Sequence, residues 1–278
     1  MKKHFLIIAT LLLSIAINAQ LLKVMTYNIR LDVAVDGEND WTHRKPFFCG
    51  QVKFYEPDFL GVQEVKPNQL TDMDSAFTDY DFIGIERDGN GKGESSNIFY
   101  KKDKFILKTQ NTFWISQTPD TVSKGWDAAY NRVCTYGLFK AKKTKKHFWV
   151  FNTHLDHIGE IARTKGIELI LSKISALNTK NYPVIFMGDL NSEPTTQRII
   201  DLKNKMNDCK EISIAKPFGP IGTFNNFEHN KPVTKLIDYI FVSKNNNIIV
   251  NKYAVLSDSD NLRYPSDHFP VYVELKIN

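Results

Sequence analysis

The segment Met187-Gly188-Asp189-Leu190-Asn191-Ser192-Glu193-Pro194 places the strongest constraint on how this chain can fold. Before it, residues 183–187 form an apolar run typical of a strand buried on both faces. After it, Pro194 suits the first turn of a helix. Asp189 and Asn191 therefore stand where a central strand ends, a place where a rigid strand fixes side chains and a loop gives access to them. An isolated D-x-N pattern is more often an Asx turn that ends a strand, so the rest of the chain has to decide.

Residues 1–19 have the pattern of a secretory signal peptide. Lys2 and Lys3 precede an apolar run, Phe5 to Ile17, and a small-residue cleavage site ends at Ala19. The apolar run of about 13 residues is shorter than the ~20 residues that cross a bilayer. We therefore expect a mature chain that begins near Gln20, has no stable membrane anchor, and is periplasmic or secreted.

The composition predicts a folded domain without a strong charge preference. Hydrophobic residues make up 42% of the 278 residues and aromatic residues 12%, enough for a sizeable core. Without Lys2 and Lys3 the formal charge falls from +5 to +3, which is too small to indicate nucleic-acid binding. Cys49, Cys134 and Cys209 are irregularly spaced, so they exclude a zinc ribbon and allow at most one intramolecular disulfide.

Strands and helices alternate along residues 20–278. Strands are predicted at 21–28, 58–65, 80–86, 97–100, 105–116, 133–140, 147–153, 183–187, 236–242, 248–256 and 269–275. Helices are predicted at 41–55, 68–77, 160–177 and 197–202, and residues 206–235 are expected to be mostly loop. Because no repeat or linker interrupts this pattern, we expect one domain, a mixed-sheet α/β sandwich.

Polar side chains collect at the ends of these predicted strands. They are Asn28, Glu64, His154, Asp189, Asn191, Asp238, Asp267 and His268. Each has an ordinary structural explanation when taken alone, such as a turn cap, a solvated carboxylate or a hydrogen-bonded core histidine. Eight of them flanking core strands favour one shared site.

The sequence blocks around these residues resemble a known family. The blocks are Thr26-Tyr27-Asn28-Ile29-Arg30, Gln63-Glu64-Val65, Asn152-Thr153-His154-Leu155-Asp156, Gly188-Asp189-Leu190-Asn191-Ser192, Ile237-Asp238-Tyr239-Ile240 and Ser266-Asp267-His268-Phe269-Pro270. In this order, across residues 22–276, they resemble the endonuclease/exonuclease/phosphatase superfamily, which has the DNase I-like fold. The resemblance implies a four-layer α/β sandwich, with two mixed sheets face to face and helices outside, and metal-dependent hydrolysis of phosphoester bonds.

The residue types fit this chemistry. A phosphodiester is anionic and resists attack by water, so hydrolysis needs charge neutralisation and an activated nucleophile. Asn28, Glu64 and Asp267 offer oxygen ligands, which suit Mg²⁺ or Mn²⁺. The resemblance implies that Glu64 is a metal ligand, and that Asp189 and Asn191 orient the attacking water or help to hold a second metal.

The resemblance also assigns the histidines. Asp238 is implied as the partner that fixes the tautomer and orientation of His268, and His268 itself acts either as general base or as a protonated phosphate ligand. His154 is expected to contact the phosphate or to assist the leaving group. Arg132 is either a phosphate clamp or a member of a surface ion pair.

Two features bear on the substrate. Abasic-site endonucleases of the family carry an acidic residue two positions after the asparagine of the first block, where this chain has Arg30, a candidate for substrate binding. That difference argues against DNA repair. The loop 124–132 resembles secreted bacterial members related to RNA-trimming deadenylases. In this loop Trp126 and Tyr130 either stack on a base or sugar ring or pack on the edge of the sandwich.

The basic run Lys140-Ala141-Lys142-Lys143-Thr144-Lys145-Lys146 lies in a predicted turn between two strands. At ~3.3 Å per residue it lies on the order of 20 Å from His154, beyond the Debye length of ~8–10 Å. We interpret it as a solvated hairpin turn.

The sequence therefore predicts an exported phosphoesterase that depends on Mg²⁺ or Mn²⁺ and acts as a monomer without an obligate protein partner. A nuclease acting on RNA or DNA is the first expectation. The alternative is a phosphatase or phosphodiesterase acting on sugar, inositol or lipid phosphates. A non-catalytic binding module is disfavoured because such a module has no need for the full residue set.

Overall fold

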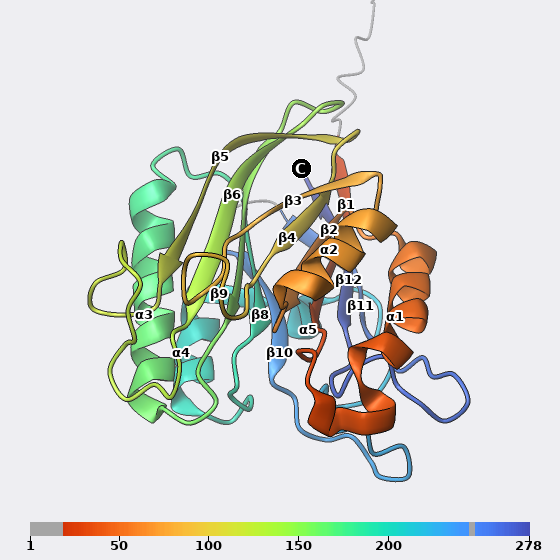
Figure 1. Ribbon diagram of the computed structural model, residues 1–278. Coiled ribbons are helices and arrows are strands. Elements are labelled where there is room, and N and C mark those ends of the chain that lie inside the picture. Colours follow the sequence, from red (N-terminus) through yellow and green to blue (C-terminus); the bar gives the residue numbers. More distant parts are fainter. Residues whose placement is uncertain (1–18, 245–247) are drawn as a thin grey trace, which may run out of the picture.

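Two β-sheets packed face to face between two layers of helices form the protein, as the computed structural model shows for residues 19–244 and 248–278 (Figure 1). The predicted export signal, residues 1–19, lies outside the described residues except for Ala19. Within the described ranges, no helix is both long and apolar enough to cross a membrane.

Each sheet has six strands and mixes parallel with antiparallel pairs. The first has the order β11-β12-β1-β2-β4-β3 and the second β5-β6-β7-β8-β10-β9. In the first sheet the bounds are β1 (Gln20–Asn28), β2 (Phe59–Gln63), β3 (Tyr80–Ile83), β4 (Ile98–Lys101), β11 (Ile248–Val255) and β12 (Val271–Ile277). In the second they are β5 (Phe105–Trp114), β6 (Val133–Ala141), β7 (His147–His154), β8 (Val184–Asp189), β9 (Met206–Asp208) and β10 (Asp238–Ser243). This arrangement confirms the predicted mixed-sheet sandwich.

Helices cover the outer face of each sheet. The helices α1 (Trp41–Tyr55) and α2 (Pro67–Ala76) lie over the first sheet, and α3 (Glu160–Leu177) and α4 (Gln197–Lys205) over the second (Figure 1). The Asp40 side chain caps α1 by accepting a hydrogen bond from the His43 amide.

The structure departs from the predicted elements where they are very short. The 3₁₀ helix η1 (Ala34–Asn39) was not predicted, and the expected loop 206–235 begins with β9 and the single-turn helix α5 (Cys209–Ile212). Three residues of β9 pair with the edge of β10. An element this short is stabilised by its neighbours and leaves no periodic pattern in the sequence.

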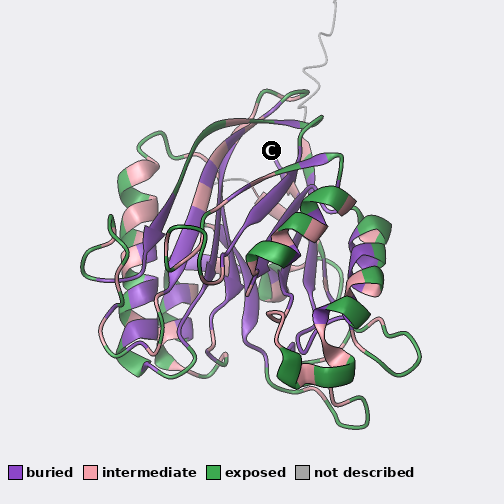
Figure 2. Cartoon of the chain, in the orientation of Figure 1, coloured by how far each residue is buried: buried purple, intermediate pink, exposed green. Residues whose placement is uncertain are grey.

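Three hydrophobic clusters hold the four layers together. One lies between the sheets, one between the first sheet and α1 and α2, and one between the second sheet and α3 and α4. In the inter-sheet cluster the ring of Phe59 lies 4.8 Å from that of Phe139 and 5.4 Å from that of Phe148, measured between centroids. Figure 2 shows the strands buried and the outer faces of the helices exposed. The three cysteines are buried and unpaired.

The strand registers bring the polar strand ends to one edge. The parallel strands β7 and β8 end side by side, with His154 opposite Asp189, and the antiparallel β10 begins with Asp238 opposite Asp189. In the first sheet β1 and β2 also end together, with Asn28 opposite Gln63. The basic run lies in the turn between β6 and β7, at the other end of β7 from His154.

Gly188 allows β7 and β8 to approach closely at this edge. Its φ of +144° is rarely adopted by other residues, and a Cβ atom there would lie 2.0 Å from the carbonyl oxygen of Thr153. The glycine before Asp189 is therefore required by backbone geometry.

We expect Gly188→Ala to lower the free energy of unfolding by about 2 kcal/mol or more, because both the φ angle and the contact with β7 are unfavourable. Gly50→Ala is the matched control. Gly50 is an exposed residue of α1, and apart from its chain neighbours and the adjacent helix backbone no atom lies within 4 Å of the place that an alanine methyl group would take. Alanine should therefore raise stability by about 0.5–1 kcal/mol. Urea unfolding of both variants tests the prediction, and equal stabilities would contradict it.

Candidate active site

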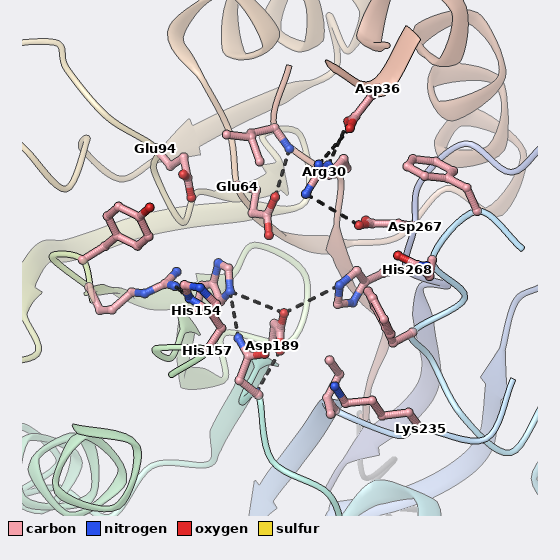
Figure 3. A pocket seen from close by; sticks show the side chains of 18 of the residues that line it. Arg30, Asp36, Glu64, Glu94, His154, His157, Asp189, Lys235, Asp267 and His268 are labelled. Carbon is pink, nitrogen blue, oxygen red and sulfur yellow. Dashed lines mark hydrogen bonds and ion pairs between the residues drawn. The ribbon is translucent and has the colours of Figure 1, made fainter. Parts of the chain in front are cut away.

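A cleft of about 740 Å³ opens at the shared edge of the two sheets (Figure 3). The sequence-predicted residues that line it are Arg30, Glu64, Tyr130, Arg132, His154, Asp189, Asn191, Asp267 and His268. Asn28 and Asp238 do not line the cleft, but they contact residues that do. Residues from distant parts of the chain are therefore brought together in one place.

Asn28 connects the two sheets at the floor of the cleft. Its Nδ2 atom donates to Glu64 Oε1 and to Asp189 Oδ2, both at 3.0 Å, and the side chain is buried. Its Oδ1 atom accepts a hydrogen bond from the backbone amide of Arg30 at 3.0 Å. In this arrangement Asn28, predicted as a metal ligand, orients two carboxylates, and its oxygen keeps a second lone pair.

Asp189 ends its strand in an Asx turn and also lies beside both histidines of the cleft. Its Oδ1 atom accepts from the Asn191 amide at 2.9 Å, which is an Asx turn at the strand end. Its Oδ2 atom lies 3.5 Å from His154 Nε2 and 3.9 Å from His268 Nε2. Burial, and then the nearby Asp238 carboxylate, raise the pKa of Asp189 above its usual value. A carboxylate with a raised pKa at this position can accept a proton from an attacking water.

His268 is held by a buried carboxylate. Its Nδ1 atom lies 2.9 Å from Asp238 Oδ2, so Nε2 is left for the cleft. Burial opposes a positive charge on the ring, but Asp238 outweighs it and the pKa of His268 is raised to about 10. A charged imidazole in this position suits a phosphate oxygen.

His154 has the opposite electrostatic environment. Burial, with Arg132 as the next contribution, lowers the pKa of His154 well below its usual value. Asn191 Nδ2 lies 3.0 Å from His154 Nε2 and also donates to the Leu155 carbonyl. If Asn191 donates to Nε2, the ring proton is on Nδ1, which is buried and has no partner among the described residues. One charged and one neutral histidine therefore flank Asp189.

Arg132 and Tyr130 lie on one wall of the cleft. Arg132 is 5% exposed, and its Nε atom lies 3.3 Å from Asp156 Oδ2 while Nη2 lies 3.1 Å from His157 Nδ1. Tyr130 is 53% exposed and stacks on His157 with 5.8 Å between the ring centroids. By contrast, Trp126 packs against the hydrophobic cluster between the second sheet and its helices and does not line the cleft.

Arg30 lies on the opposite wall. Its Nε and Nη2 atoms each donate to the Asp36 carboxylate at 2.8 Å, and Nη1 lies 3.9 Å from Asp267 Oδ2. The position that is acidic in abasic-site endonucleases thus holds a fixed cation next to Asp267.

The carboxylates on the first-sheet side fit a divalent cation. Burial raises the pKa of Asp267, and Glu64 adds to this although His268 opposes it. Such a concentration of negative charge is relieved by a cation, and the donors are oxygens. Ligand atoms of Asp189, Asp238 and His268 also lie within 4.8 Å of one another. A cation at this second group would disrupt the hydrogen bond between His268 and Asp238, which a cation at Glu64 and Asp267 would leave intact.

Sequence reasoning missed several residues of the site. Arg87, Glu94, His157 and Lys235 line the cleft. A usable signal existed for Arg87 and Glu94, because opposite charges bracket the Gly-rich turn 89–93. Lys235 lay within the segment expected to be loop.

Comparison with known proteins identifies the family. The sequence profile described as "Endonuclease/Exonuclease/phosphatase family" matches residues 25–268. This chain belongs to that family. A solved structure of a family member from Bacteroides thetaiotaomicron is 39% identical, with a TM-score of 0.87, and the match covers 94% of this chain and 99% of that one.

Two further relatives have names that include an activity. The structure of a mannosyl-6-phosphatase from Bacteroides thetaiotaomicron is 41% identical with a TM-score of 0.86, covering 91% of this chain and 99% of that one. A probable RNA exonuclease from Saccharomyces cerevisiae is 26% identical, and the match covers 69% of this chain but only 43% of the relative. Members of the family are metal-dependent hydrolases of phosphoester bonds, and this protein is an enzyme of that class.

We expect Asp238→Asn to lower kcat by about 10²–10⁴-fold, because the amide no longer holds His268 in the charged, oriented form. The measurement is hydrolysis of p-nitrophenyl phosphate with Mg²⁺, alongside urea unfolding to check the fold. Asp201→Asn on the exposed face of α4 is the control and should keep wild-type rates. A folded Asp238→Asn enzyme with more than a tenth of wild-type kcat would refute this role.

Proposed function

We propose that this protein is an exported phosphatase that uses Mg²⁺ or Mn²⁺ to release phosphate from a phosphorylated sugar. The hydrolytic part is supported by a single observation: Asp189, His154 and His268 converge within 4 Å opposite the carboxylates of Glu64 and Asp267. Export is supported by the signal-like pattern of residues 1–19. The proposal includes a monomeric enzyme, as expected from the sequence.

The chain's own residues divide the work at the phosphate. Asp189 accepts the proton of the attacking water, and Asn191 keeps Asp189 and His154 in place. His268, charged through its contact with Asp238, binds a phosphate oxygen. Glu64 and Asp267 would hold the metal, which when bound would supply positive charge to neutralise the phosphate and the leaving oxygen.

The charges of the cleft support a small phosphate ester over a nucleic acid. Among the described residues that line the cleft, five carboxylates face four lysine and arginine side chains. Three of the cations lie in ion pairs, Arg30 with Asp36, Arg87 with Glu94 and Arg132 with Asp156. Binding along a nucleic-acid backbone instead uses a row of cations that neutralise successive phosphates.

The relatives point the same way. The 41% identical structure is named as a mannosyl-6-phosphatase and matches this chain over 91% of its length, whereas the probable RNA exonuclease is 26% identical. This reverses the order of the two substrate classes expected from the sequence, where a nuclease came first.

A nuclease is the second candidate, supported by one feature of the cleft. Tyr130 presents an exposed ring at the wall, and such a ring can stack on a base as well as on a sugar. The substrate test therefore includes both classes.

We expect the purified mature enzyme with Mg²⁺ or Mn²⁺ to release phosphate from mannose 6-phosphate and to leave single-stranded RNA and DNA intact. Inositol phosphates, nucleotides and phospholipids complete the panel. Cleavage of oligonucleotides without release of phosphate from any sugar phosphate would replace the sugar phosphatase with the nuclease.

Removing the metal should abolish this activity, and adding Mg²⁺ back should restore it, since the carboxylates alone repel a phosphate. Glu64→Gln should lower kcat/KM by about 100-fold or more by weakening metal binding, and added metal should partly rescue it. Glu168→Gln, at an exposed ion pair on α3, is the matched control. Full activity in EDTA would exclude the metal-dependent mechanism.

A further inference from the structure

The wall of the cleft beside Glu64 carries a polar pair that the hydrolytic chemistry does not use. Arg87 and Glu94 form a two-point ion pair, with Arg87 Nη2 2.8 Å from Glu94 Oε1 and Nη1 2.9 Å from Oε2. Their side chains are only 11% and 13% exposed. The cost of removing two charges from water largely cancels the attraction between them, so a buried ion pair adds little stability. The position of this pair in a binding cleft therefore needs another explanation.

The pair keeps free hydrogen-bonding capacity. Each carboxylate oxygen of Glu94 accepts one bond from Arg87 and has a further lone pair to offer. Arg87 Nε is buried and makes no hydrogen bond among the described residues, although it lies 3.9 Å from Asp88 Oδ2. A planar acceptor next to a planar donor is complementary to two neighbouring hydroxyl groups, each of which donates and accepts.

An aromatic ring lies directly against this pair. The Arg87 guanidinium carbon lies 4.9 Å from the centroid of the Tyr130 ring, and the same ring also stacks on His157. Half of Tyr130 remains exposed at the cleft. A ring face beside hydrogen-bonding groups is the usual composition of a pocket that binds a partly polar ligand such as a sugar.

The wall is pre-formed by contacts between its two loops. Residues 87–94 form a tight turn in which the Arg87 amide donates to the Glu94 carbonyl at 2.8 Å. Asn131 Nδ2 donates to Asp88 Oδ1 at 2.9 Å, which joins this turn to the loop that carries Tyr130. A binding wall that is already ordered loses less entropy when a ligand binds.

The position of this wall matches the leaving group. In phosphoryl transfer the attacking and leaving oxygens are roughly in line. Asp189, which activates water in the proposed mechanism, and Glu64 both accept a hydrogen bond from Asn28 Nδ2. Glu94 lies beyond Glu64, on the side away from His268 (Figure 3). A sugar on a phosphate oxygen that points away from Asp189 and His268 therefore reaches Glu94.

We propose that Arg87, Glu94 and Tyr130 form a sugar-binding subsite that holds neighbouring hydroxyl groups and one ring face of a phosphorylated hexose. The inference rests on the proposed phosphatase function and adds the residues that select its substrate. Arg87 and Glu94 bind the hydroxyls, and Tyr130 packs against the ring.

The test compares mannose 6-phosphate with p-nitrophenyl phosphate, which has no sugar hydroxyls. Glu94→Gln should lower kcat/KM for mannose 6-phosphate by about 10- to 100-fold, mainly through a higher KM. The loss on p-nitrophenyl phosphate should be at least about tenfold smaller. Glu274→Gln removes a carboxylate from an ion pair with Lys252 outside the cleft and serves as the matched control.

Tyr130 provides a second, independent arm because its side chain is exposed and its loss should not prevent folding. Tyr130→Ala should raise KM for mannose 6-phosphate by about 3- to 10-fold, and Tyr130→Phe, which keeps the ring, should restore most of the affinity. Equal losses on both substrates for Glu94→Gln, together with an unchanged KM in Tyr130→Ala, would overturn the subsite.

The two proposals fail in different ways. A wild-type enzyme that hydrolyses p-nitrophenyl phosphate but no sugar phosphate contradicts the proposed function and the subsite with it. A wild-type enzyme that hydrolyses mannose 6-phosphate, with variants that show no change in preference between the two substrates, contradicts the subsite alone.

Discussion

Hydrogen bonds donated by buried side-chain amides hold the two sheets in register at their shared edge, and the site depends on them. Asn28 Nδ2 donates to Glu64 from the first sheet and to Asp189 from the second. Behind it, Gln63 Nε2 donates to Asn152 Oδ1 at 2.7 Å, and Asn152 Nδ2 donates to two backbone carbonyls of the first-sheet side. Apolar contacts between sheets are non-directional, whereas buried hydrogen bonds are costly to leave unmade. These amides therefore fix the distance between the carboxylates of Glu64 and Asp189.

This registration creates an electrostatic problem that the chemistry then uses. Carboxylates from both sheets, Glu64 and Asp267 on one side and Asp189 and Asp238 on the other, would together repel a phosphate. Asp238 places a positive charge on His268, and the divalent metal that we propose at Glu64 and Asp267 would supply the rest. The need for a metal thus follows from the same packing that brings the acidic strand ends together.

Most of the fold and the position of the site could be predicted from the sequence, because buried strands leave continuous apolar runs with a polar residue at the end. What could not be predicted depends on tertiary contacts. Trp126 and Tyr130 are four residues apart in an irregular loop without periodicity, and only the structure shows that the first packs on the core and the second faces the cleft. Gln63 and Asn152 stood inside the quoted motif blocks, but a sequence does not show that two amides meet across two sheets. Arg87 and Glu94 carry opposite charges on either side of a Gly-rich turn, a pattern that indicates an ion pair but not that the pair lines the cleft.

The contrast between strand-end and loop residues also explains why the sequence predicts the reaction class better than the substrate. The groups proposed to act on the phosphate lie at strand ends, where the backbone hydrogen bonds of two sheets hold them in place. Groups that meet the rest of the substrate come from two loops, 87–94 and 117–132, which can change without disturbing those strands. In this chain a hydrogen bond from Asn131 to Asp88 joins the two loops. Within the loop 87–94, Arg87 and Glu94 form an ion pair with each other. In the proposed function such a wall offers hydroxyl-binding groups close to one phosphate, and the described residues of the cleft include no series of unpaired cations for a second or third phosphate. That arrangement supports a sugar monophosphate over a nucleic-acid strand as the substrate.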